Sequence, residues 1–199
     1  VAVVGNNPYF GVFGGAPLTH GMVMWVAICA ALNGAMGGIF ARLLGKGPAA
    51  MAPASWRAWV RGHPIWTAFA MGLVLALIGL VTAGSVYGTG YGAAADLLSG
   101  ETQHALPAGF GVAKLAATVA SYWAGIPGGI FTPALTTGAG IGHHIWELAG
   151  EGVDQRVLVL VSMAAFLAAA TQAPLTASVV VMEMTGSQPM LFWLLVSSL

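Results

Sequence analysis

Hydrophobic residues form long runs along this chain, and polar or turn-forming residues separate them. The runs cover residues 22–44, 65–83, 91–98, 110–123, 130–148, 157–170 and 175–184, and a last one begins at Met190. About 20 apolar residues in a helix cross a bilayer core, so the first two runs have spanning length. Several others are too short to cross upright. Repeated short apolar segments broken by glycine and proline are typical of discontinuous helices in membrane transport proteins.

The longest polar stretch, residues 42–61, separates the two spanning runs. It carries Arg42, Lys46, Arg57 and Arg61, which are four of the six basic residues in the chain. Cytoplasmic loops of membrane proteins carry an excess of lysine and arginine. We therefore expect a polar loop on the cytoplasmic side of the membrane.

Composition agrees with a membrane protein. Hydrophobic residues make up 58% of the 199 residues and charged residues only 6%, whereas soluble domains carry about 25% charged residues. The net charge of zero argues against nucleic acid as a partner. The single cysteine, Cys29, allows no internal disulfide or thiolate cluster, and we expect it to be a small apolar helix residue. We predict an all-α polytopic integral membrane protein with broken, tilted helices and no cofactor.

The two ends of the chain bear on its domain organisation. Residues 1–18 carry enough asparagine, proline and glycine to be irregular. The chain begins at Val1 rather than Met, and Leu199 stands inside an apolar run. We expect a piece of a larger protein, with residues 1–199 forming part of one membrane domain and no separate soluble domain.

The stretch from Gly125 to Gly142 is the central motif of the chain. Pro-Gly-Gly at residues 127–129 cannot continue a helix. Pro133 suits the first turn of the next helix, because its missing N–H would be unpaired there anyway. The first N–H groups of a helix have no carbonyl partner within it and carry the positive end of its dipole. A helix start at membrane depth is therefore a candidate anion site.

The candidate anion-binding groups are the backbone amides of Gly129, Ile130 and Phe131. The alternative is an ordinary connection between two helices at the membrane surface, and the local pattern leaves both open. A nucleotide-phosphate loop is disfavoured because no Gly-Lys-Ser/Thr follows the glycines.

Two charged residues stand inside or at the end of apolar runs. Lys114 lies four residues into the run 110–123 and is a candidate source of positive potential near an anion path. The competing interpretation is a lysine that extends along its methylenes to the membrane interface. Glu183 could relay protons, but we favour a carboxylate that bonds backbone groups at a helix end.

The sequence gives little support for an enzyme or a metal site. His143 and His144 are adjacent, so on a helix they point in different directions, whereas a shared metal favours i, i+4 spacing. Trp146 and Glu147 beside them suggest the membrane interface. Neither a Gly-x-Ser-x-Gly nor a His-Glu-x-x-His motif occurs. We therefore predict no catalytic residue, no metal site and no enzyme.

Four stretches resemble the CLC family of chloride channels and chloride/proton antiporters. The most specific is Gly-Ile-Pro-Gly-Gly-Ile-Phe-Thr-Pro at residues 125–133, which is similar to the family's Gly-x-Pro-Gly-Gly-Ile-Phe-x-Pro signature. The others are residues 5–10, the Gly-Thr-Gly-Tyr turn at 88–91, and residues 172–185 with Ala-Pro-Leu-Thr and a terminal Glu-Met-Thr. Lys114 falls where the family often has a basic residue.

The resemblance implies the second half of an inverted repeat of intramembrane helices, in a bacterial cell (inner) membrane protein. The implied ligand is chloride or a similar small anion, bound by the amides of Ile130 and Phe131. The implied assembly is a homodimer that forms through helices around residues 174–199. The implied activity is that of a voltage-gated channel or a chloride/proton antiporter. In the family, the gating glutamate lies in a Gly-x-Glu-Gly-Pro motif of the first half, and Gly-Glu-Gly at 150–152 does not match it because it lacks the proline. The family's serine ligand also belongs to the first half, and we expect the counterpart of its tyrosine ligand beyond Leu199.

Two other function classes remain as alternatives. A secondary transporter of another anion or an organic substrate would also use broken helices, and it predicts a larger cavity with a charged partner for the substrate. A membrane-embedded enzyme predicts His, Asp or Glu converging inside the apolar runs. The sequence offers little for either apart from Lys114.

Overall fold

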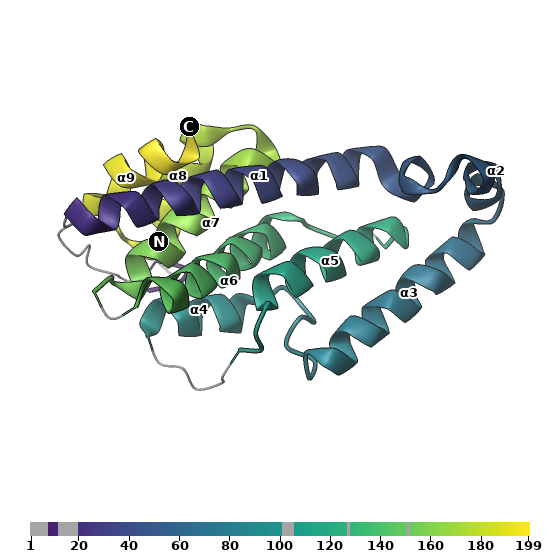
Figure 1. Ribbon diagram of the computed structural model, residues 1–199, viewed down its shortest axis with the longest axis horizontal. Coiled ribbons are helices and arrows are strands. Elements are labelled where there is room, and N and C mark those ends of the chain that lie inside the picture. Colours follow the sequence, from purple (N-terminus) through teal and green to yellow (C-terminus); the bar gives the residue numbers. More distant parts are fainter. Residues whose placement is uncertain (1–7, 12–19, 101–105, 127, 151) are drawn as a thin grey trace, which may run out of the picture.

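A computed structural model of the protein describes residues 8–11, 20–100, 106–126, 128–150 and 152–199, and within these the regular structure is helical. The helices are α1 (His20–Met51), α2 (Ala54–Gly62), α3 (Pro64–Val81), α4 (Tyr91–Ser99), α5 (Phe110–Trp123), α6 (Phe131–Ala149), α7 (Gln155–Thr171), α8 (Pro174–Thr185) and α9 (Leu191–Ser198), with a 3₁₀ turn at Gln188–Met190 (Figure 1). The predicted all-α fold is confirmed. The predicted run 110–123 matches α5 residue for residue.

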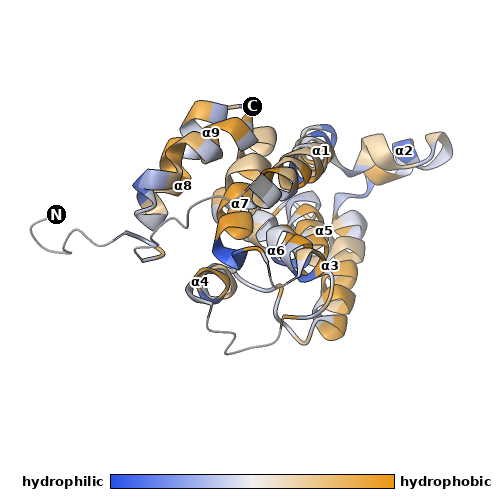
Figure 2. Cartoon of the chain, turned by 60° about the vertical axis from the view of Figure 1, so that its left-hand side comes forward, coloured by the Kyte–Doolittle hydropathy of each residue, from blue (hydrophilic) through white to orange (hydrophobic). Residues whose placement is uncertain are grey.

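Two of these helices are long and apolar enough to cross a membrane, among the residues that the structure describes. They are Gly21–Met51 within α1 and Pro64–Val81, which is α3. Thr67 and Gly79 are the two buried residues of α3, and Figure 2 colours this helix as largely hydrophobic on the outside of the bundle. An outward apolar helix of this kind is stable where lipid covers it.

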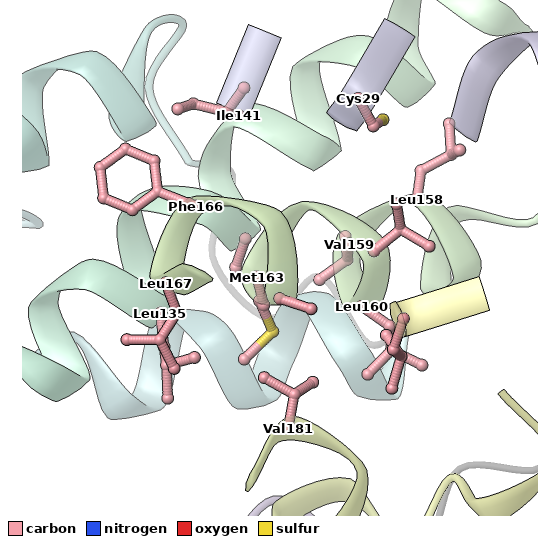
Figure 3. Packing of buried hydrophobic residues seen from close by; sticks show 14 of the residues in the cluster. Cys29, Leu135, Ile141, Leu158, Val159, Leu160, Met163, Phe166, Leu167 and Val181 are labelled. Carbon is pink, nitrogen blue, oxygen red and sulfur yellow. The ribbon is translucent and has the colours of Figure 1, made fainter. Parts of the chain in front are cut away.

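The helix α7 is the centre of the bundle. Every residue from 157 to 168 is buried, and α7 packs against α1, α6, α8 and α9. Around it, Leu135 of α6, Met163 and Phe166 of α7 and Val181 of α8 form part of the apolar core (Figure 3). Cys29 is fully buried in the same core, in agreement with its expected role.

Glycines set how closely the central helices approach. A Cβ built on Gly138 of α6 would lie 2.6 Å from the carbonyl oxygen of Ser162 in α7. One built on Gly142 would lie 2.7 Å from the oxygen of Leu158. Small residues four apart allow such backbone contact between membrane helices. In α1, a Cβ built on Gly37 would lie 2.7 Å from the Cβ of Ala169 in α7, whereas Gly34 and Gly38 have no such neighbour within 4 Å among the described residues.

The prediction of a polar loop at residues 42–61 is wrong. Helix α1 continues to Met51 with a kink at Gly47, whose φ of 69° and ψ of 175° are non-helical, and α2 follows directly. Glycine adopts this backbone conformation without steric cost, so the chain bends there without losing its helical character on either side. The predicted irregular segment 1–18 lies almost entirely outside the described residues.

Candidate functional site

The start of α6 is built as the sequence predicts. Helix α6 begins at Phe131, and Pro133 falls in its first turn. The first helical hydrogen bond runs from Ala134 N to Ile130 O, at 2.9 Å. The N–H groups of Phe131 and Thr132 therefore have no partner inside the helix. No carbonyl of the described residues accepts from the amides of Gly129, Ile130 or Phe131 either.

A pocket of about 180 Å³ lies beside this helix start. Its walls come from α3, the turn before α4, α5 and the segment leading into α6. The lining residues are Leu75, Val86, Tyr87, Gly88, Lys114, Ala117, Thr118, Ser121, Tyr122, Ile126, Gly128, Gly129, Ile130 and Pro133. A water molecule occupies about 30 Å³ of liquid, so a small ion fits with part of its hydration shell.

Lys114 holds one wall of this pocket together. Its side chain is only 2% exposed. Its Nζ donates hydrogen bonds of 2.7 Å to the carbonyl oxygens of Val86 and Gly88. Extension to the membrane interface is therefore wrong for this lysine. An ammonium has three N–H donors, so one remains after these two bonds.

The turn that Lys114 binds is also fixed from α6. The hydroxyl of Thr136 donates to the carbonyl oxygen of Thr89, at 3.2 Å. Gly90 next to it has a φ of 80°, and a Cβ there would lie 2.5 Å from the Thr136 methyl carbon. Glycine is therefore required at position 90, both for the left-handed backbone and for the close approach of α6.

The structure brings three of the four predicted site residues to one pocket. Gly129, Ile130 and Lys114 line it, whereas Phe131 is not among the lining residues and its side chain is 39% exposed. Sequence reasoning did not identify Thr118 and Ser121, which also line the pocket. They stand four and seven residues after Lys114, so helical spacing would have placed them on its face.

The other charged candidates lie away from this pocket. Glu183 is exposed near the end of α8, and none of the described residues hydrogen-bonds its carboxylate, so the predicted bond to backbone groups at the helix end is wrong. His143 and His144 both contact Glu147, with N···O distances of 3.7 and 2.7 Å. The amide of Gly109 donates to His144 Nε2 at 2.6 Å, so Nε2 accepts and Nδ1 carries the proton given to Glu147.

A second, larger hollow is a groove of about 770 Å³ between α1, α7 and α9. Alanine, glycine and valine residues make up most of its lining, with Gln172 and Trp193 among the polar and aromatic exceptions. None of the residues that line it is charged. The groove therefore lacks a group that could balance the charge of an ionic substrate.

Comparison with known proteins decides the family. The family model described as "Voltage gated chloride channel" matches residues 1–199. The chain belongs to the voltage-gated chloride channel family. Its helical fold and the signature at the start of α6 are thus those of a CLC protein.

Bacterial proteins are among the relatives of this chain. The "Voltage-gated ClC-type chloride channel ClcB" of Salmonella typhimurium is 36% identical over 139 residues, which are 67% of this CLC chain and 33% of the relative. ClcB of Escherichia coli K12 is also 36% identical, over 140 residues. An uncharacterized protein of Haemophilus influenzae is 64% identical over 55 residues, or 28% of this chain and 56% of that one. The chain spans about a third of the length of the ClcB proteins.

A solved structure shares the fold. The crystal structure of a CLC-type fluoride/proton antiporter matches with a TM-score of 0.72 at 21% identity, and the match covers 92% of this chain and 44% of the other. The predicted arrangement of broken membrane helices is therefore confirmed at the level of the fold.

Proposed function

We propose that this chain supplies one half of a CLC-type pathway for small inorganic anions, with chloride as the ligand. The observation that carries the proposal is the shared pocket: the buried ammonium of Lys114 and the segment Gly129–Ile130 line the same 180 Å³ space. Backbone amides without a carbonyl partner, from Gly129 and Ile130, and the positive charge of Lys114 thus belong to residues that line one pocket. This is the chemistry that replaces the hydration shell of an anion.

The charge of the residues that line the pocket favours anions over cations. Among its lining residues, the one that carries a full charge is Lys114, and no carboxylate is present. The neutral hydroxyl-bearing residues Thr118, Ser121 and Tyr122 also line this pocket. The N-terminus of α6 adds a partial positive charge of about half an elementary charge. A cation entering this space would find no compensating group.

Binding and transport are tested on the full-length protein in liposomes. We expect chloride flux that falls when Phe131→Pro removes one amide donor at the first helical position. A proline disfavours the helical backbone of the residue before it, and Ile130 has φ −92° and ψ −10°, so the variant is first checked for folding. The control Phe131→Leu keeps the amide and should keep the flux. A parallel change in internal pH would identify a proton-coupled antiporter, and its absence a channel. Wild-type flux in a folded Phe131→Pro protein would contradict an amide site at Phe131.

The rival proposal of an organic-substrate transporter rests on the 770 Å³ groove. Such a transporter needs a charged partner for its substrate, and the lining of the groove has none. The geometry therefore favours the smaller pocket and a small ion.

The assembly and location follow from the same proposal. We assign a homodimer formed through α8 and α9, around residues 174–199, in the inner membrane of a bacterium. Support comes from the apolar side chains that these helices leave exposed, including Leu175, Val179 and Phe192, and from the bacterial relatives.

A further inference from the structure

The short helix α2, Ala54–Gly62, carries two different faces and buries none of its residues. Trp56, Trp59 and His63 follow one face. The Trp56 and Trp59 ring centroids are 5.9 Å apart, and the Trp59 ring stacks on the His63 ring at 4.9 Å. At about 100° per residue, Arg57 and Arg61 fall roughly opposite Trp59 and His63. The helix is therefore amphipathic along its whole length.

The aromatic face of α2 is largely exposed on the surface of the described chain. Trp56 is 59% exposed and Trp59 is 43% exposed. Tryptophan is enriched at the boundary between lipid and water, where its ring contacts acyl chains and its N–H reaches polar groups. Two neighbouring exposed tryptophans on one helix face are thus suited to the headgroup region of a bilayer.

The charge of this region is of one sign. Residues 42–63 contain Arg42, Lys46, Arg57 and Arg61 and no acidic residue, and the first acidic residue of the whole chain is Asp96. Arg57 donates its Nε to the carbonyl oxygen of Ala52 at 3.1 Å. None of the four basic residues forms an ion pair with a carboxylate of the described residues. Their positive charge is available to an external anionic surface.

The position of α2 in the fold agrees with contact to an anionic membrane surface. Helix α2 connects the ends of α1 and α3, the two helices long and apolar enough to span a membrane. In Figure 1 it lies at the far end of α1, where the chain turns back into α3, and in Figure 2 it projects from the bundle. A connection between two spanning helices stands where hydrocarbon gives way to headgroups.

We propose that α2 is an interfacial helix that binds the headgroups of anionic lipids. Its tryptophan face inserts at the acyl boundary, and Arg57 and Arg61 contact lipid phosphates. Arginine presents a planar fork that matches phosphate geometry. Each basic side chain near an anionic surface strengthens binding by about five- to sixfold. The pair therefore contributes roughly thirtyfold.

The test titrates the full-length protein in detergent with phosphatidylglycerol or phosphatidylcholine and counts bound lipids by native mass spectrometry. Phosphatidylglycerol should bind more tightly than phosphatidylcholine. Arg57→Gln combined with Arg61→Gln should lower its affinity roughly thirtyfold, and each single change about fivefold. Replacing both arginines by lysine should preserve the preference for the anionic lipid. The control Arg156→Gln, an exposed arginine on α7, should leave that affinity unchanged.

A second measurement places the lipid at α2. Hydrogen exchange of residues 54–63 in nanodiscs should slow when phosphatidylglycerol is added to phosphatidylcholine, and this slowing should vanish in the double glutamine variant. Equal affinity for the two lipids would overturn the proposal. So would a glutamine variant that stays monodisperse and keeps the wild-type preference. A glutamine variant that changes only the oligomeric state would assign α2 to a contact between copies of the chain instead.

Discussion

Lys114 is the residue whose replacement tests the proposed pocket most directly. Lys114→Met removes the charge and keeps most of the side-chain volume. For an anion about 6–8 Å from Nζ, and an effective dielectric constant of about 20, the lost attraction is about 2–3 kcal/mol. We therefore expect chloride affinity to fall by roughly thirty- to a hundredfold.

The same substitution also has a structural effect. It leaves the carbonyl oxygens of Val86 and Gly88 without the hydrogen bonds of 2.7 Å that Lys114 donates. An unsatisfied buried acceptor costs about 1–3 kcal/mol. The midpoint of thermal unfolding should therefore fall as well, and a loss of affinity could come from a displaced turn rather than from the missing charge.

Two controls separate charge from structure. Lys114→Arg keeps the charge and should retain most of the chloride affinity. Thr136→Val releases the neighbouring carbonyl oxygen of Thr89 while Lys114 stays in place, so the thermal midpoint should fall with little change in affinity. Affinity is measured by isothermal titration calorimetry with chloride. A folded Lys114→Met protein with wild-type affinity would refute the electrostatic role, as would an equal loss in Thr136→Val.

Three further predictions concern packing and assembly. Gly138→Ala should lower the free energy of unfolding in a denaturation assay by about 1–3 kcal/mol, because its methyl carbon would lie 2.6 Å from a backbone oxygen of α7. The control Gly38→Ala, with open space around it, should be nearly neutral in the same assay. His144→Leu leaves the amide of Gly109 unpaired and should cost about 1–3 kcal/mol by thermal unfolding, and an unchanged midpoint would show that water replaces the imidazole. Phe192→Arg, on the exposed face of α9, should shift the full-length protein toward monomers in light scattering, and an unchanged mass would remove this face from the interface.

Hydrophobic pattern predicted the helices well because burial in lipid or protein demands long apolar runs. It located α5 to the residue and placed Pro133 in the first turn of α6. It failed at residues 42–61, where polarity alone was taken to mean a loop. The spacing of Trp56 and Trp59, three residues apart, is helical, and it would have predicted α2.

The candidate site was only partly predictable for a different reason. The start of α6 is encoded locally by glycine and proline, so the sequence located it. The partners of Lys114 lie 28 and 26 residues earlier in the chain. Such contacts depend on how α5 packs beside the turn before α4, and no local pattern contains that information. Whether Lys114 reached the interface or the interior could be learned only from the assembled helices.

The close contact of α6 with α7 limits how an ion path beside α6 can open. The carbonyl oxygens of Ser162 and Leu158 sit where side chains at positions 138 and 142 would be. A screw motion of α6 by one residue, with a turn of about 100° and a rise of about 1.5 Å, would bring Ala139 or His143 against those oxygens and produce steric overlap. The amide end of α6 is therefore anchored to the middle of the bundle. Within this chain, a movement that widens the pocket therefore has to come from its other walls, which are α5, α3 and the turn before α4.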